Sequence, residues 1–197
     1  MSTQARPTVV IAEDESLIRL DLAEMLDELG YDVVGQVGDG AAAVRLVEQL
    51  SPTIVVLDVK MPILDGLTAA ERIGAFGKTA IVMLTAFSQR ELVERATDAG
   101  AMAYLVKPFS ETDLAPTLEV ARARHAERLA LESEVSDLQA RIEARKVVER
   151  AKGELTRKFG LDEAAAFRWL QKAAMDRRMS MAEVSAVVIT ELADKDS

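Results

Sequence analysis

The first 107 residues alternate between two kinds of segment, and this alternation limits the possible folds more than any other feature of the chain. Short apolar runs rich in β-branched residues occur at Thr8–Ala12, Asp32–Val37, Ile54–Leu57, Ala80–Leu84 and Ala103–Val106. Amphipathic stretches of helical length separate them, near residues 16–29, 41–50, 66–76 and 89–99. Strands buried on both faces read as continuous apolar runs, and strand–helix alternation implies parallel pairing with right-handed crossovers. The pattern predicts an α/β domain with a five-stranded, doubly wound parallel sheet.

The C-terminal part of the chain has a purely helical pattern. Thr117–Lys152 contains no Gly or Pro over 36 residues, and as one helix it would extend about 54 Å at ~1.5 Å per residue. Gly160 is a typical helix terminator, and Asp162–Glu163 is a typical start for the next helix. Ser180 and Glu183 have the spacing of a capping box for a last helix. We therefore expect three helices in this region, the first continuing the long one.

A short apolar seam runs along the long helix. Its residues follow a 4-3-4 spacing and are Leu131, Val135, Leu138 and Ile142. The neighbouring seam positions are basic, at Arg124, Arg128 and Arg145. Because a coiled coil needs apolar residues over several heptads, this brief seam favours a weak or conditional homodimer over a permanent one.

Charge is distributed unevenly in a chain whose net charge is −9. Residues 1–120 hold 9 basic against 19 acidic side chains, whereas residues 141–178 hold 11 basic against 6 acidic ones. An acidic front half joined to a locally basic back half indicates two different tasks. The alternative is that both are ordinary solvated surfaces.

Composition excludes several classes of chemistry. The absence of cysteine rules out disulfides, thiolate zinc sites, iron–sulfur clusters and a Cys nucleophile, and one histidine cannot supply a multi-His metal site. That residue, His125, is expected to be exposed on the long helix. No apolar run approaches 18 residues and Met1–Pro7 lacks a signal-peptide segment, so we expect a cytoplasmic protein without a membrane partner.

Polar residues stand at the carboxyl ends of four predicted strands. Glu13-Asp14-Glu15 follow the first run, Asp58 the third, Thr85 the fourth and Lys107-Pro108 the fifth. In open parallel sheets, chemistry gathers at this edge. Converging carboxylates repel one another, and a hard divalent cation such as Mg²⁺ relieves the repulsion. A carboxylate beside Mg²⁺ can attack phosphorus to form an acyl phosphate, whose oxygens a Lys and a hydroxyl stabilise.

Each of these residues also has an ordinary explanation. An Asp at a strand end is usually a helix cap or a turn former, and Thr85 or Lys107 alone is typical of a loop. Their joint occurrence at four strand ends, in this order, favours a site. A phosphohydrolase of the haloacid dehalogenase type is a second interpretation, but that chemistry uses another Asp two residues after the nucleophile, where this chain has Lys60.

The same residues resemble the receiver domain of two-component response regulators. The resemblance covers about Thr8–Arg122 and rests on Glu13-Asp14 in IAEDE, Asp58 in VVLDVKMPILDG, Thr85 in MLTAF and Lys107 in AYLVKPF. It implies a flavodoxin-like (CheY-like) fold in which Asp58 is the phospho-acceptor. Thr85 and Lys107 would bind the phosphoryl group, and the Lys107–Pro108 peptide bond would be cis.

The receiver resemblance also implies a metal site and a switch. Asp14 and Asp58 would be Mg²⁺ ligands, Glu13 would act through the metal's water shell, and the backbone carbonyl of Lys60 would complete the protein ligands. Tyr104 matches the aromatic residue that rotates inward on activation. Glu at position 13 and Lys at position 60 replace Asp and Asn of many receivers, and the Lys60 side chain is expected to tune the phosphate lifetime.

The C-terminal region resembles the ANTAR domain, an RNA-binding three-helix module of transcription antiterminators. The resemblance covers about Asp137–Leu192. It rests on Ala144-Arg145, Ala151-Lys152-Gly153 with Leu155, Gly160, Ala166-Phe167 with Leu170, and the closing apolar helix. Gln171 and Ser185 stand where the family often has Arg and Ala. Receiver, coiled coil and ANTAR domain in one chain resemble the actinobacterial ANTAR response regulators.

Basic residues of this region are candidate RNA contacts, with ordinary solvated helix charges as the alternative. They are Arg145, Lys152, Lys172, Arg177 and Arg178. Phe167 is expected in the core, while Trp169 is equally compatible with the core and with stacking on bases. Gly153 inside a helix costs ~1 kcal/mol relative to Ala, so we expect it to admit another helix closely, with RNA as the alternative.

The expected organisation is a receiver domain over residues 1–122, a coiled-coil linker helix over 123–140 and an ANTAR domain over 137–197. A sensor histidine kinase would phosphorylate Asp58 in the presence of Mg²⁺. Two paired ANTAR domains would then bind hairpin RNA in nascent transcripts and cause antitermination. The chain would not be an enzyme beyond its own phosphorylation and dephosphorylation. An output domain that binds DNA or a protein instead of RNA is the alternative.

Overall fold

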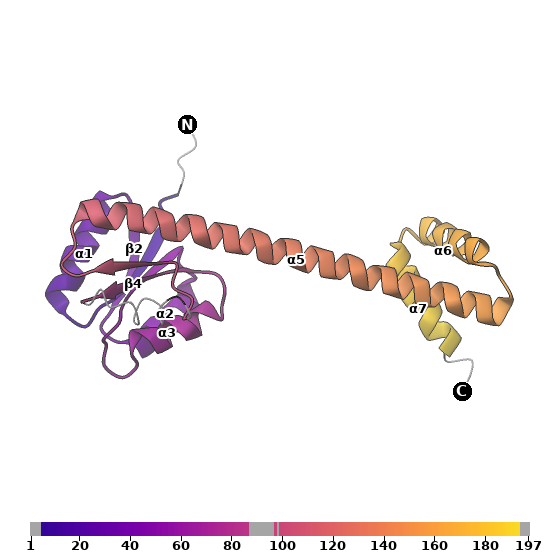
Figure 1. The fold of residues 1–197 in the computed structure, drawn as a ribbon, viewed down its shortest axis with the longest axis horizontal. Helices are drawn as coiled ribbons and strands as arrows, with labels where there is room; N and C mark the ends of the chain where they lie inside the picture. Colours follow the sequence, from indigo (N-terminus) through magenta and orange to yellow (C-terminus); the bar gives the residue numbers. More distant parts are fainter. Residues whose placement is uncertain (1–4, 87–96, 98, 194–197) are drawn as a thin grey trace. The chain divides into compact units, whose positions relative to one another are not determined.

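The structure is a computed structural model, drawn in Figure 1, which describes residues 5–86, 97 and 99–193. Residue contacts divide the chain into two compact units, Met1–Ala130 and Leu131–Ser197. The elements in chain order are β1 (Thr8–Ala12), α1 (Ser16–Glu28), β2 (Asp32–Val37), α2 (Gly40–Leu50), β3 (Ile54–Asp58), α3 (Gly66–Gly74), β4 (Ala80–Thr85), β5 (Ala103–Val106), α5 (Glu111–Phe159), α6 (Glu163–Arg177) and α7 (Met181–Ala193). Within the described ranges, no helix combines the length and the apolar character needed to cross a membrane.

A five-stranded sheet forms the centre of the N-terminal unit, with the strand order β2-β1-β3-β4-β5. All four strand pairings are parallel. The predicted doubly wound α/β fold is therefore confirmed, and the observed strands agree with the predicted ones to within one residue at each end. The helix predicted near residues 89–99 falls largely outside the described residues.

Alternate residues of the central strands supply two separate cores, because successive side chains of a strand point to opposite faces. Ile11 packs into one core with Leu22 of α1 and Leu118 of α5. Its neighbour Val10 packs into the other core with Ile73 of α3. Strands β3 and β4 are buried along their whole length. Each large aliphatic side chain buried in this way contributes about 1.5–3 kcal/mol to the stability of the fold. The well-packed sheet therefore holds the loops at its carboxyl edge in place.

Helix α5 contacts the sheet through a stripe of buried residues. Leu114, Leu118 and Ala121 are buried, and His125 continues the stripe with only 7% of its surface exposed. The prediction that His125 is exposed is therefore wrong. The 4-3-4 spacing places His125 on the docked face of the helix, and the sheet still lies beneath the helix at this turn.

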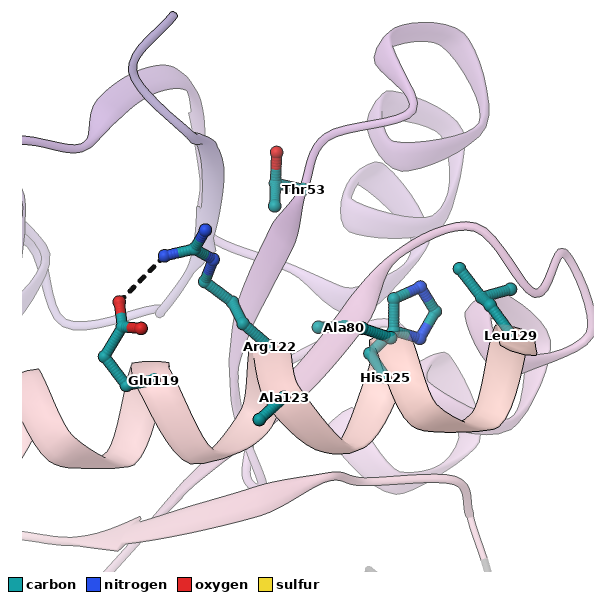
Figure 2. A pocket seen from close by; sticks show the side chains of 8 residues that line it. Thr53, Ala80, Glu119, Arg122, Ala123, His125 and Leu129 are labelled. Atoms are coloured by element: carbon teal, nitrogen blue, oxygen red, sulfur yellow. Dashed lines mark hydrogen bonds and ion pairs between the residues drawn. The ribbon is translucent and has the colours of Figure 1, made fainter. Parts of the chain in front are cut away.

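Figure 2 shows the surroundings of His125, where α5 passes the starts of β3 and β4. Its imidazole helps to line a cavity of about 400 Å³, together with Thr53 and Ala80. Arg122 extends from the same helix and donates a hydrogen bond to Glu119 at 2.8 Å. At this turn α5 therefore faces the starts of β3 and β4, where the sequence alone suggested open solvent.

Beyond residue 130, nothing in the described part of the chain covers the apolar seam of α5 to a comparable degree. Leu131, Val135, Leu138 and Ile142 are each 50–56% exposed. Helix α5 contains Pro116, and the helix is longer at both ends than the Gly- and Pro-free stretch of the sequence. The pairing of this seam with a second copy stays a prediction.

The C-terminal unit is a bundle of the end of α5 with α6 and α7. One core joins Leu155 of α5, Leu170 of α6 and Val188 of α7. The predicted helix boundaries are confirmed. Gly160, with φ +68°, follows the end of α5, and the Asp162 carboxylate accepts a hydrogen bond from the first turn of α6 at 2.7 Å.

The capping box of the last helix is also confirmed. The backbone N–H of Ser180 donates to the carboxylate of Glu183 at 2.7 Å, and the N–H of Glu183 donates to the Ser180 hydroxyl at 3.2 Å. Hydrogen bonds from Ser180 lower the pKa of Glu183. The reciprocal bonds satisfy two donors at the start of α7 that have no partner within the helix.

Two expectations for this unit are wrong. Phe167 is 44% exposed and is absent from the core. Residues 166 and 170 turn their side chains inward at helical spacing, and Phe167 lies on the flank of that stripe. Gly153 is exposed, and a Cβ built there would meet nothing within 4 Å, so no helix among the described residues approaches it. The surfaces around Phe167 and Gly153 are therefore open.

Replacing Ser185 by Ala is expected to stabilise the C-terminal unit by about 1 kcal/mol. Ser185 is fully buried in α7, and its hydroxyl has no hydrogen-bond partner among the described residues. A buried hydroxyl without a partner costs about 1–3 kcal/mol, and Ala also has the higher helix propensity. Urea unfolding of the full chain, with hydrogen exchange of α7, measures the effect. The exposed Ser136→Ala is the matched control for propensity, and a gain no larger than in that control would contradict the prediction.

Candidate phosphoryl-transfer site

Asp58 lies at the carboxyl end of β3, where the chain turns sharply toward α3. Its side chain is 8% exposed, and one carboxylate oxygen accepts a hydrogen bond from the backbone N–H of Lys60 at 2.8 Å. Gly66, which sequence reasoning missed, makes this turn possible. A Cβ at Gly66 would lie 1.9 Å from the backbone oxygen of Asp58. The available signal was the glycine directly after Asp65 at the end of VKMPILDG, because glycine lets two backbone segments approach closely.

An acidic cluster forms where β1 and β3 end side by side. The carboxylates of Glu13, Asp14 and Asp58 each place one oxygen within 4.8 Å of the others. Glu13 is fully buried, and Asp14 is exposed. Three converging carboxylate oxygens are the donor set that hard divalent cations bind, so the residues present fit a magnesium ion.

Lys107 places its ammonium between two of these carboxylates. Its Nζ lies 2.6 Å from an oxygen of Glu13 and 2.7 Å from an oxygen of Asp58. The following Lys107–Pro108 peptide bond is cis, as expected. One positive charge thus compensates two carboxylates from different strands, which ties β5 to β1 and β3 at the edge of the sheet.

The pKa values at this edge reflect both burial and pairing. Burial raises the pKa of Glu13, while its hydrogen bond to Lys107 acts in the opposite direction. Burial alone would lower the pKa of Lys107, but hydrogen bonds to Asp58 and Glu13 outweigh it and the pKa is raised. Lys107 therefore stays protonated throughout the neutral range, and burial disfavours the charged form of Glu13.

A cavity of about 230 Å³ opens beside the acidic cluster and brings most of the predicted residues together. It is lined by Asp14, Glu15, Asp58, Val59, Lys60, Thr85, Ala86 and Lys107. The backbone N–H of Lys107 donates to the carbonyl of Thr85 at 2.8 Å, which keeps these two strand ends in register. Tyr104 does not line this cavity. It is 47% exposed and borders a separate depression with Pro116 and Val120.

The candidate RNA contacts differ in how available they are. Arg145, Lys172, Arg177 and Arg178 are exposed. Lys152 is buried, and its Nζ lies 2.8 Å from oxygens of both Glu149 and Glu163. Hydrogen bonds to these two glutamates raise the pKa of Lys152. Its ammonium joins α5 to the start of α6 instead of standing free on the surface.

Fold and site together define a response regulator, in which a receiver is followed by a further helical domain, and the chain belongs to that family. Residues 9–119 match the response regulator receiver domain, and residues 136–189 match the ANTAR domain. The chain is 59% identical over 184 residues to the transcriptional regulatory protein PdtaR of Mycobacterium tuberculosis, covering 93% of this chain and 90% of that protein.

Solved structures resemble the receiver part of the chain. The receiver domain of the putative response regulator NarL from Mycobacterium tuberculosis superposes with a TM-score of 0.58 at 28% identity, covering 60% of this chain and 98% of that one. The CheX–CheY–BeF3–Mg complex from Borrelia burgdorferi gives a TM-score of 0.55 at 25% identity, covering 56% and 85%. Both agree with the CheY-like fold of the N-terminal unit.

Replacing Glu13 by Gln is expected to raise the melting temperature of the N-terminal unit at neutral pH in EDTA. Because folding raises the pKa of Glu13 above its usual 4.5, the charged form is disfavoured in the folded state. Stability is therefore lost as the pH rises through the folded-state pKa, and it is regained toward pH 4.5. Gln is neutral at every pH, so the difference in melting temperature between variant and wild type should shrink on acidification, as Glu13 becomes protonated. Thermal melts at several pH values test this, with exposed Glu15→Gln as the control; equal melting temperatures at neutral pH would contradict it.

Proposed function

We propose that Asp58 of this response regulator accepts a phosphoryl group from a sensor histidine kinase, with Mg²⁺ as the cofactor. The observation that carries this is the meeting of Asp58, the acidic pair Glu13-Asp14 and the Lys107 ammonium, 2.7 Å from Asp58, at one sheet edge. Asp14, Asp58 and the Lys60 carbonyl would hold the cation, and Glu13 would act through its water shell. A bound Mg²⁺ supplies positive charge that offsets the phosphoryl oxygens. The BeF3 and Mg named with the CheY relative support this assignment.

The proposed step is a transfer between two residues. A carboxylate oxygen of Asp58 attacks phosphorus, the bond from phosphorus to the kinase's histidine nitrogen breaks, and the imidazole leaves with the electron pair. Lys107 then pairs with a phosphoryl oxygen, and the Thr85 hydroxyl donates a hydrogen bond to another. Tyr104 follows Thr85 inward from its exposed position. The chain acts in the cytoplasm as a phospho-acceptor, and its only chemistry is its own phosphorylation and dephosphorylation.

The proposed output is binding of hairpin RNA by the C-terminal unit. The match to the ANTAR domain supports this class of ligand. Exposed basic side chains at Arg145, Lys172, Arg177 and Arg178 provide phosphate contacts. Phe167 and Trp169 are 44% and 47% exposed, and exposed aromatic rings can stack on unpaired loop bases. Binding to a nascent transcript would prevent a terminator from forming.

Phosphorylation is proposed to pair two chains through the exposed α5 seam, so that two C-terminal units act on one RNA. The local charge at Asp58 would bias the association, as in other two-state switches. The dimer then has two C-terminal units that can bind one RNA. When the RNA carries two hairpins, binding of the first raises the effective concentration for the second, so the dimer binds more tightly than a single chain.

Binding to a tandem-hairpin RNA, with and without acetyl phosphate and Mg²⁺ over a range of salt concentrations, tests the proposed function. We expect tighter binding after phosphorylation and a fall in affinity with salt, since basic side chains contact phosphates. Duplex DNA of the same sequence is the control. Preference for the duplex would favour a DNA-binding output, and no binding to either nucleic acid would favour a protein partner; both results overturn the RNA proposal.

A further inference from the structure

The seam of α5 presents both an apolar stripe and a pattern of flanking charges to a second copy of the chain. Leu131, Val135, Leu138 and Ile142 are each about half exposed, so a partner helix has apolar surface to cover. In the heptad that these residues define, Val135 and Ile142 occupy a positions, and Leu131 and Leu138 occupy d positions. The stripe is nearly symmetric about its middle, so the apolar residues alone leave the direction of the partner helix open.

The flanking charges disfavour a parallel pair. In a parallel coiled coil, each g residue faces the e residue five positions on in the partner. Glu134 would face Gln139, which carries no charge, and Arg141 would face Lys146. The second contact places two cations together, and symmetry repeats it on the other side of the pair. A parallel dimer therefore gains no ion pair from these positions and acquires two repulsive contacts.

The same charges favour an antiparallel pair. When the helices run in opposite directions with Val135 opposite Leu138, Leu131 lies opposite Ile142 and every apolar layer is filled. The g positions then face each other, which brings Glu134 of one copy to Arg141 of the other, twice over. Both side chains are exposed on α5 and are available for this contact.

We propose that two copies of this chain associate through α5 as an antiparallel coiled coil, held in register by two Glu134–Arg141 ion pairs. This inference rests on the homodimer of the proposed function and specifies its geometry. The seam is too short to give tight binding by itself, so the register is set by the two ion pairs, which both lie on the flank formed by the g positions.

Disulfide trapping tests the orientation directly, because the chain contains no cysteine of its own. Full-length Leu131→Cys and Ile142→Cys are prepared separately, treated with acetyl phosphate and Mg²⁺, and oxidised alone or mixed. In the antiparallel pair, the two copies of position 131 lie ~16 Å apart at ~1.5 Å per residue, beyond the reach of a disulfide. We expect a cross-linked dimer only in the mixture. Cross-linking of each variant alone would show a parallel pair and overturn the proposal.

Charge reversal gives an independent measurement on surface residues that do not affect folding. Glu134→Arg and Arg141→Glu are each expected to weaken self-association about tenfold in sedimentation, and the double variant to restore it. A parallel pair predicts the reverse for Arg141→Glu, which would gain an attraction to Lys146, and such a result overturns the proposal. If the wild-type chain remains monomeric when phosphorylated, the homodimer of the proposed function fails together with this orientation, whereas phosphorylation and RNA binding are decided by their own assays.

Discussion

Asp58→Asn is expected to abolish formation of the acyl phosphate with acetyl phosphate or with a phosphorylated kinase. The amide lacks the nucleophilic oxygen pair of a carboxylate, and it also weakens one ligand of the proposed cation site. The side chain is nearly the same size and keeps an acceptor for the N–H of Lys60, which lies 2.8 Å away in the wild type. The fold should therefore survive. Intact mass after incubation with the phosphodonor and Mg²⁺ measures the effect as the presence or absence of one added phosphoryl group.

Asp65→Asn is the matched control for this experiment. Asp65 lies in the same loop, caps α3 through the N–H of Thr68 at 3.1 Å, and takes no part in the acidic cluster. Asn caps helices about as well as Asp, so this variant should be phosphorylated as fast as wild type. Phosphorylation of Asp58→Asn at the wild-type rate would show that another carboxylate is the acceptor.

Leu170→Ala is expected to destabilise the C-terminal unit by about 3 kcal/mol, because the truncation leaves a cavity among side chains from three helices. Leu170 is fully buried in the core of that unit. In so small a unit, the loss should unfold most molecules and remove RNA binding with it. Hydrogen exchange measured by mass spectrometry localises the unfolding to the end of α5, α6 and α7.

Phe167→Ala separates stability from binding in the same helix. Phe167 is exposed, so its removal should leave exchange in α6 unchanged while it weakens binding to hairpin RNA, by about 1–3 kcal/mol if a base stacks on the ring. Unfolding of the unit by Phe167→Ala would show that the ring packs into the core after all. Protection of α6 in Leu170→Ala would show that the core tolerates the cavity.

The sequence predicted the fold, and the meeting of Asp58, Thr85 and Lys107 at one sheet edge, because both depend on local signals. Continuous apolar runs give the strands, and a residue at the end of a parallel strand must lie at one edge of the sheet. Asp58, Thr85 and Lys107 therefore line one cavity although 49 positions separate the first from the last. Helix caps such as Asp162 depend on only a few neighbouring residues, so their motifs predict them reliably.

What the sequence did not predict depends on the partner that each helix face meets. His125 stands in a polar stretch but is buried, because α5 still lies on the sheet at that turn. Phe167 neighbours core residues but is exposed, since a shift of one position turns a side chain by about 100° around a helix. Lys152 was expected at the RNA surface, yet Glu163 of the next helix holds its ammonium. Such contacts between distant residues leave no periodic signal in the chain.

The placement of Trp169 gives the molecule a built-in optical reporter. It is the only tryptophan of the chain, lies on α6 and is about half exposed, whereas both tyrosines belong to the N-terminal unit. Selective excitation of tryptophan therefore observes the C-terminal unit alone, without any dye. A change in its emission when the phosphodonor reacts at Asp58 would mean that the signal has travelled from one unit to the other. The communication between the two units can thus be timed, in an unmodified protein, separately from the arrival of RNA.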